Sequence, residues 1–218
     1  MKTKKKRLII LLSIAAIVIG FTVWDIFIDP PAWWRFERQQ DKLVISEYVE
    51  RNYPNAKNTG GQFPIQKIAE VHRASTMYFE LDEIEFKVSA EYGKIVSDGY
   101  PEARATAQID DIIKDGFLKP KNLTAGTLYR FHDDYNNYPY TGNLYVELRV
   151  QGLSPQDVGW LYDFYGYWKK EGEFFSDYRV DIYVNEGNEN MGWIVIKKDS
   201  EFADETEFYS AFKICPYW

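Results

Sequence analysis

The segment Ile84-Glu-Phe-Lys-Val-Ser-Ala90 places an apolar side chain at every second position, and a short connection containing Gly93 separates it from Ile95-Val96. Successive side chains of a β-strand point to opposite faces of a sheet, so this alternation predicts a strand with one buried face. Glycine in the connection favours a tight turn between antiparallel strands. The segment therefore predicts a β-hairpin, and the stretch from Met77 to Leu81 predicts a neighbouring strand.

A helix is predicted before this hairpin, over residues 31–52. Pro31 is favoured at a first helical position, and Tyr53-Pro54 ends the pattern. The second half of the helix is amphipathic, with an apolar face made of Val44, Ile45, Tyr48 and Val49. Such a face docks on another part of the protein. Self-association through the region from Trp33 to Tyr48 is the alternative.

Helical spacing returns after the hairpin with Ala105, Ile109, Ile112 and Ile113, and Gly116 stands where a C-terminal cap is expected. The chain then loses its periodicity and becomes rich in Asn, Asp, Tyr, Gly and Pro. This composition is typical of a loop, so residues 117–142 are expected to connect two halves of the molecule.

The second half repeats the order of a helix followed by a hairpin. Leu144 to Val150 alternates as a strand, and Ser154-Pro155-Gln-Asp157 has the composition of a helix start, with the helix expected to reach about Lys170. Residues 178–184 and 193–196 then predict two strands, joined by a loop over residues 185–190.

These patterns predict an α+β fold in which antiparallel strands pack with helices. Two separate helix-plus-hairpin units and one continuous sheet fit the patterns equally. The expected organisation is a cytoplasmic basic tail (1–7), a transmembrane signal anchor (8–28), a first α+β unit (29–116), the connecting loop (117–142) and a second α+β unit (143–218).

The predicted helix over residues 155–170 is apolar on two sides. Val158, Leu161, Tyr162, Tyr165 and Trp168 share one face, and Trp160, Phe164 and Tyr167 lie nearly opposite. Only a strip with Gln156, Gly159, Asp163, Gly166 and Lys170 is weakly polar. A helix of this kind either lies between two layers or presents one face to a partner. Core packing is the favoured interpretation, and docking of a partner protein, a second copy or a glycan is the alternative, for which Trp160, Phe164 and Tyr167 are the candidate binding residues. The two glycines would be tolerated where another backbone comes close.

The chain begins with five basic residues among its first seven positions, followed by an uncharged apolar run from Leu8 to Trp24 that Ile28 extends. At 1.5 Å per residue, 21 helical residues span about 31 Å, which matches the hydrocarbon core of a bilayer. Basic residues on the N-terminal side predict a cytoplasmic amino terminus and an extracytoplasmic body. The competing interpretation is a cleaved signal peptide, but small residues do not alternate after the apolar run as a cleavage site requires.

Composition excludes some classes of function. Residues 8–218 carry 21 Lys and Arg against 33 Asp and Glu, a net charge of −12, which lacks the basic surface of a nucleic-acid-binding protein. The single cysteine, Cys215, allows neither an intrachain disulfide nor a cysteine-based metal site. No cofactor, metal or catalytic residue is predicted, because nucleophile elbows, phosphate-binding glycine loops and helical zinc motifs are missing from the sequence.

A second candidate binding region lies in the predicted loop. Asp133, Asp134, Tyr135 and Tyr138 combine carboxylate oxygens with aromatic rings, a set that suits a cation or a sugar. The same residue types are also common in solvated loops. Adjacent acids such as Asp110-Asp111 leave open a hydrolase that uses paired carboxylates.

The Lys-rich anchor, the helix ending in Tyr48-Val-Glu-Arg-Asn-Tyr-Pro54, the alternating strand and the segment Gly93-Lys-Ile-Val-Ser-Asp-Gly-Tyr100 together resemble small, uncharacterised membrane-anchored exported proteins of Gram-positive bacteria. The resemblance covers roughly residues 1–115 and brings no catalytic residues. The outline of a helix and hairpins is also similar to PepSY-like or cystatin-like modules, which bind or inhibit. We therefore expect a single-pass, outward-facing binding module of the cell envelope with a protein or glycan partner, and an envelope hydrolase is the alternative.

Overall fold

The computed structural model describes residues 32–62, 74–152, 155–186 and 189–213, without the side chains of residues 32–37, 186 and 189–191. The chain divides into two compact units, one ending at Tyr100 and the other beginning at Pro101. Each unit has its own four-stranded sheet, and α2 to α5 are the α-helices of the described part, so the α+β class is confirmed. The predicted anchor, residues 8–28, lies outside the described residues. Within them, no helix has both the length and the apolar character needed to cross a membrane.

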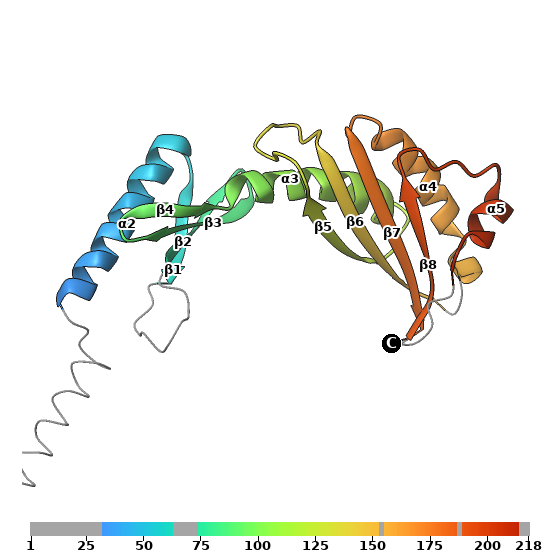
Figure 1. Cartoon of the computed structure of the whole chain (residues 1–218), viewed down its shortest axis with the longest axis horizontal. Coiled ribbons are helices and arrows are strands. Elements are labelled where there is room, and N and C mark those ends of the chain that lie inside the picture. The colour runs from blue at the N-terminus through green and yellow to red at the C-terminus, as the bar shows by residue number, and fades with distance from the viewer. Residues whose placement is uncertain (1–31, 63–73, 153–154, 187–188, 214–218) are drawn as a thin grey trace, which may run out of the picture. The chain divides into compact units, whose positions relative to one another are not determined.

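The first unit places α2 (Ala32–Asn52) on an antiparallel sheet with the order β1-β2-β3-β4 (Figure 1). The strands are β1 (Lys57–Gln62), β2 (Ser75–Leu81), β3 (Ile84–Glu91) and β4 (Lys94–Asp98). The predicted hairpin and its neighbouring strand are therefore confirmed. The sequence does not predict β1, because its residues Lys-Asn-Thr-Gly-Gly-Gln are polar and all six are exposed.

The apolar face of α2 forms half of the first core. Ile45 and Val49 are buried, and they pack with a sheet whose buried side chains include Phe79, Phe86 and Val88. The opposite face of the helix is exposed, as its polar residues predict. The amphipathic pattern thus docks this half of α2 within its own unit.

A buried carboxylate joins α2 to the sheet. Asp41 accepts hydrogen bonds from the Ser75 hydroxyl (3.0 Å) and from the backbone N–H of Gly93 (2.7 Å). Tyr92 and Gly93 both have positive φ, as the central residues of a two-residue hairpin turn require. Asp41 therefore fixes the β3–β4 turn against the helix.

The second unit contains a mixed sheet with the order β5-β6-β7-β8. Its elements are α3 (Tyr100–Asp110, which begins at the last residue of the first unit), the π-helix η1 (Asp111–Leu118), β5 (Gly126–Phe131), β6 (Asn143–Gln151), the 3₁₀ turn η2 (Pro155–Val158), α4 (Trp160–Glu171), β7 (Asp177–Glu186), β8 (Glu189–Lys197) and α5 (Glu205–Ser210). The outer pairs are antiparallel, but β6 and β7 are parallel and α4 makes the crossover between them. The expectation of antiparallel pairing alone is wrong for this sheet.

Two predicted boundaries also need correction. Residues 101–116 belong to the second unit and not to the first, because Ala105, Ile109 and Ile113 are buried in the core of the second sheet. Residues 117–142 are not one connecting loop, because they contain β5. The sequence of an amphipathic helix predicts that one of its faces is buried, but it does not predict which of two sheets that face covers.

The role of Gly116 differs from the predicted helix cap. The helix continues past it as η1 to Leu118, and the cap is Lys119, whose backbone N–H donates to the Lys114 carbonyl (2.7 Å). A Cβ atom at position 116 would lie 2.2 Å from the hydroxyl oxygen of Tyr167. Glycine is needed there because the side chain of α4 approaches the backbone of η1.

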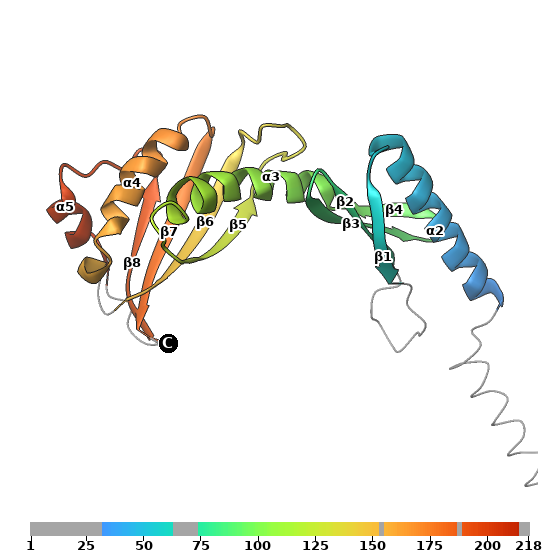
Figure 2. The same ribbon diagram turned by 180° about the vertical axis from the view of Figure 1, so that it is seen from behind.

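The helices of the second unit lie on one side of its sheet. Figure 2 shows α3 and α4 crossing in front of the strands, and Figure 1 looks onto the opposite side, which carries none of the helices that the structure describes. Buried positions alternate along β6 and β7, where Val146, Leu148, Val180 and Ile182 have no more than 1% exposure. The core therefore lies between helices and sheet, and the other face of the sheet is open.

Candidate functional site

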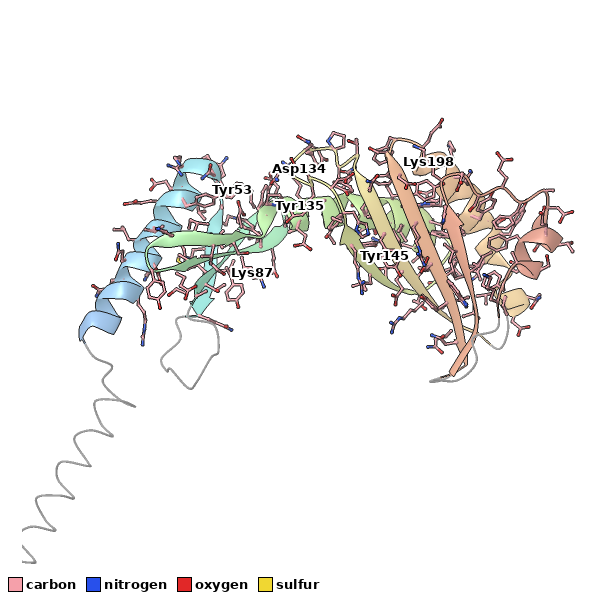
Figure 3. All side chains as sticks on the ribbon, in the orientation of Figure 1. Tyr53, Lys87, Asp134, Tyr135, Tyr145 and Lys198 are labelled. Atoms are coloured by element: carbon pink, nitrogen blue, oxygen red, sulfur yellow. The ribbon has the colours of Figure 1, made fainter. Side chains whose placement is uncertain are left out.

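The open face of the β5–β8 sheet carries an ordered set of polar and aromatic side chains. Strand register places Arg130 of β5 opposite Tyr145 of β6, Tyr145 beside Arg179 of β7, and Arg179 opposite Lys197 of β8. Partners in register point to the same face of a sheet. Three cationic side chains and one tyrosine thus form a row across all four strands. In Figure 3, Tyr145 lies over the strands on this face.

The next row of the same face contains two nearly buried carboxylates. Glu147 is 8% exposed and Asp181 is 1% exposed, and register places them side by side on β6 and β7. Asp181 accepts two hydrogen bonds from the Arg179 guanidinium, at 2.7 Å from Nε and 2.8 Å from Nη2. Glu147 pairs with Arg149 at 2.5 Å. The side chains of Arg149 and Arg179 are 67% and 48% exposed, so the cations of these two pairs are accessible to solvent and the carboxylates are not.

Tyr145 connects the two rows. Its hydroxyl donates to Asp181 Oδ2 at 3.1 Å, and the guanidinium carbons of Arg130 and Arg179 lie 5.6 and 5.7 Å from the centre of its ring. Burial, and then the negative charge of Asp181, raise the pKa of Tyr145 to about 12. The phenol is therefore neutral near pH 7 and acts as a hydrogen-bond donor to the carboxylate.

A third row, further along the strands, is aromatic. Tyr183 and Trp193 are register partners on β7 and β8, and their rings stack with an interplanar angle of 13° and centroids 6.3 Å apart. The ammonium of Lys213 lies 5.7 Å from the Trp193 ring. These two stacked rings on adjacent strands form an aromatic platform on the same face as the arginine row.

A pocket of about 400 Å³ lies at the end of the face where β6 and β7 begin. Its lining comes from β5, β6, β7 and the residue that follows β5: Arg130, His132, Asn143, Leu144, Tyr145, Asp177, Tyr178 and Arg179. This volume is in the range of pockets that take small ligands. Hydrogen-bond donors, acceptors and aromatic rings converge in it.

The charge of the face contrasts with that of its unit. Residues 101–218 contain 12 Lys and Arg against 20 Asp and Glu, a net charge of −8. Arg130, Arg149, Arg179, Lys197 and Lys213 nevertheless gather on this face. Two of its acids, Glu147 and Asp181, are nearly buried, and Asp177 at the start of β7 is exposed. The open face is a cationic and aromatic region on an acidic unit.

The loop between β5 and β6 holds the predicted candidates Asp133, Asp134, Tyr135 and Tyr138, and Figure 3 shows Asp134 and Tyr135 within it. Both carboxylates bind the backbone of their own loop. Asp133 accepts from the Asn143 backbone N–H (2.8 Å), and Asp134 accepts from that of Asn136 (2.8 Å). These bonds explain the two acids as turn-forming residues.

The two tyrosines of this loop occupy different surroundings. Tyr135 packs on Phe131, and Tyr138 is 64% exposed with the Arg104 guanidinium over its ring. The described residues contain no cluster of three or more side chains that could hold a metal ion.

The candidates on α4 pack inside the unit. The ring of Phe117 on η1 lies within 6.0 Å, centroid to centroid, of the rings of Trp160, Phe164 and Tyr167. Phe164 is fully buried, and the other two are partly buried against the same core. The second apolar face of α4 therefore covers η1, so core packing replaces partner docking for these three residues. The predicted polar strip is exposed, but no atom comes within 4 Å of a Cβ placed at Gly159 or Gly166, so the expected backbone approach is wrong there.

In the pair Asp110-Asp111, which was considered for hydrolysis, Asp110 has a structural role. Asp110 accepts from the Tyr129 hydroxyl at 2.5 Å and pairs with Lys114 at 2.8 Å. A second pocket, about 340 Å³, lies at the end of η1, where Lys114 and Lys119 are already paired with Asp110 and Asp115. The charged side chains that line this pocket are therefore all paired.

Sequence reasoning did not identify Arg130, Tyr145 or Arg179 as site residues. A signal was present in β6 and β7, where the positions between buried residues read Tyr145-x-Glu147-x-Arg149 and Arg179-x-Asp181-x-Tyr183. Exposure to solvent alone does not require arginine, an acid and tyrosine to recur on one face of two strands, so this pattern indicated an ordered surface.

Comparison with models of known protein families gave no match, and comparisons with curated proteins and with solved structures gave none either.

Proposed function

We propose that this protein is a membrane-anchored binding protein of the cell envelope, and that the open face of the β5–β8 sheet holds its partner. The charge of this face carries the proposal, because five basic side chains and two aromatic rings share it with one exposed acid, Asp177, although the unit has a net charge of −8. The two carboxylates beneath it hold Arg149 and Arg179 in place. An interaction surface with preorganised arginines and aromatic rings is typical of binding sites.

The anchor is the second part of the proposal. Residues 8–28 have the length and apolar composition of a transmembrane helix, and the basic residues before them favour a cytoplasmic amino terminus. We expect the full chain to remain in the membrane fraction after a high-salt wash, and a chain lacking residues 8–28 to be released. A mature chain whose first residue lies beyond position 28 would contradict the anchor.

Binding through the open face can be tested with detergent-solubilised full chain and detergent-washed envelopes of the producing cells. We expect cosedimentation of the chain, and about a tenfold loss of apparent affinity in Arg130→Gln and Trp193→Ala. Lys170→Gln is the matched control, because it removes one exposed positive charge from α4, on the other side of the sheet. Equal cosedimentation of wild type and the three variants with the envelopes would overturn the assignment of this face.

A further inference from the structure

The pocket at the start of β6 and β7 offers both donors and acceptors. Arg130 and the Asn143 amide supply donors, and Asp177 supplies a carboxylate of which one oxygen accepts the backbone N–H of Tyr178 (2.8 Å). A simple anion such as phosphate would meet the negative charge of Asp177. A ligand that carries hydroxyl groups beside its anionic group satisfies both kinds of side chain.

The two pocket arginines are not equivalent. Arg179 already directs Nε and Nη2 at Asp181, whereas the described residues place no carboxylate within ion-pair distance of Arg130. The guanidinium carbon of Arg130 lies 5.6 Å from the centre of the Tyr145 ring. A guanidinium is a bidentate donor suited to a carboxylate or phosphate oxygen pair.

The aromatic platform requires an extended ligand. Tyr183 lies four residues after Arg179 on β7, which is about 13 Å along a strand at 3.3 Å per residue. A single monosaccharide cannot reach both the pocket and the platform. The stacked rings of Tyr183 and Trp193 supply aromatic groups that can pack against the apolar face of a sugar ring.

From these features, and on the basis of the proposed function, we propose that the open face binds an acidic oligosaccharide, with an anionic group on Arg130, sugar hydroxyls on Asp177 and Asn143, and a further sugar ring on Tyr183 and Trp193. An acidic peptide built from Asp and Glu would offer no hydroxyl groups to the Asp177 carboxylate.

The test uses titration calorimetry of the full chain with a short oligogalacturonate and, as a matched neutral probe, the same oligomer with its carboxylates methyl-esterified. We expect binding of the acidic oligomer that weakens with added salt, and at least a tenfold weaker affinity for the ester. Arg130→Gln is expected to lower the affinity for the acidic oligomer about tenfold and to remove most of the preference over the ester. Trp193→Ala is expected to weaken both probes, and Lys170→Gln neither.

Polyglutamate and vesicles of phosphatidylglycerol serve as competing probes. Tighter binding of either one with the same dependence on Arg130 would overturn the glycan assignment, as would an unaltered affinity in Arg130→Gln or no binding of the acidic oligomer. Cosedimentation with washed envelopes separates the two proposals. If the acidic oligomer fails to bind but Arg130→Gln and Trp193→Ala still weaken cosedimentation, only the ligand class is wrong. If these two variants cosediment as well as wild type, the assignment of the binding face is wrong.

Discussion

Asp181 is almost completely buried, and its carboxylate accepts two hydrogen bonds from Arg179 and one from Tyr145. A buried carboxylate is costly unless charges and hydrogen bonds compensate it, and here Arg179 and the Tyr145 hydroxyl do so. The arrangement orients Arg179 and Tyr145 on a face that is otherwise open to solvent. Burial of the Asp181 carboxylate costs free energy, and the hydrogen bonds that offset this cost hold Arg179 and Tyr145 in fixed positions.

The pKa of Tyr145 makes the stability of this arrangement depend on pH. A folded-state pKa of about 12, raised from an ordinary value of 10.0, contributes stability below pH 10 that is lost as the pH rises towards 12. Burial also raises the pKa of Tyr178 to about 12, so wild type should lose stability across this window. We expect Tyr145→Phe to lower the slope of the free energy of unfolding against pH between 10 and 12, as measured by urea denaturation.

The control for this prediction is Tyr138→Phe, which changes a 64% exposed tyrosine outside the face. Its slope should match that of wild type. If Tyr145→Phe and wild type had the same slope, the Tyr145 hydroxyl would not be coupled to Asp181 in the folded protein.

At the scale of elements, two glycines in neighbouring helices should respond in opposite ways to alanine. Gly116→Ala forces a Cβ against the Tyr167 hydroxyl, and overpacking of this kind costs about 1–3 kcal/mol. Gly166→Ala meets no atom within 4 Å on the exposed side of α4 and should stabilise the protein by about 0.5–1 kcal/mol. Chemical denaturation of the two variants measures both effects.

Tyr167 provides a check on the mechanism, because its hydroxyl both occupies the space beside Gly116 and donates to the Ile112 carbonyl at 2.9 Å. In a Tyr167→Phe background, Gly116→Ala should cost less than in wild type. Additive effects of the two substitutions would show that the hydroxyl is not the obstacle.

The contact between η1 and α4 leads to a further prediction. Phe117 is 3% exposed and touches three aromatic rings of α4, so Phe117→Ala should lower the free energy of unfolding by about 3–5 kcal/mol. Thermal and urea denaturation can measure this loss, with Leu128→Ala on the solvent-exposed part of β5 as a control of small effect. A small effect of Phe117→Ala would contradict the assignment of this aromatic group to the core.

The elements that the sequence predicts correctly have clear periods bounded by glycine or proline. Strands β3 and β6 alternate strictly, and α2 has one apolar stripe. Strand β5 lacks such a signal, because its residues read Gly-Thr-Leu-Tyr-Arg-Phe and none of them is fully buried. The parallel pairing of β6 with β7 has no sequence signature either, since side chains alternate in the same way in both kinds of ladder.

The candidate site depends on relations that no single segment contains. Arg130 could not be placed on the face without β5, and the row from Arg130 to Lys197 appears only when the register of four strands is known. The sequence left Phe164 open between core packing and binding for a related reason. A helical wheel shows two apolar faces on α4, but it does not reveal that η1 supplies the second covering layer.

At the scale of the whole molecule, each unit has its own sheet and its own core. Phe86 is 5% exposed and contacts the rings of Tyr53, Phe79 and Tyr100 in the first unit, so Phe86→Ala should destabilise that unit. Ile182 is fully buried in the second core, and Ile182→Ala is the counterpart there. Because the buried cluster around Ile182 consists, among the described residues, of residues from Ala105 onwards, the effect of each substitution should stay within its own unit.

Hydrogen exchange followed peptide by peptide in the full chain can measure this separation. In Phe86→Ala, amides of β2 to β4 should exchange faster while those of β6 and β7 keep their protection, and Ile182→Ala should give the reverse pattern. Separate units would let the acidic second unit keep its binding face folded when the first unit opens. A rise in exchange across both sheets from either substitution would instead mean that the chain unfolds as one cooperative body, and the face could then not be treated as the property of one unit.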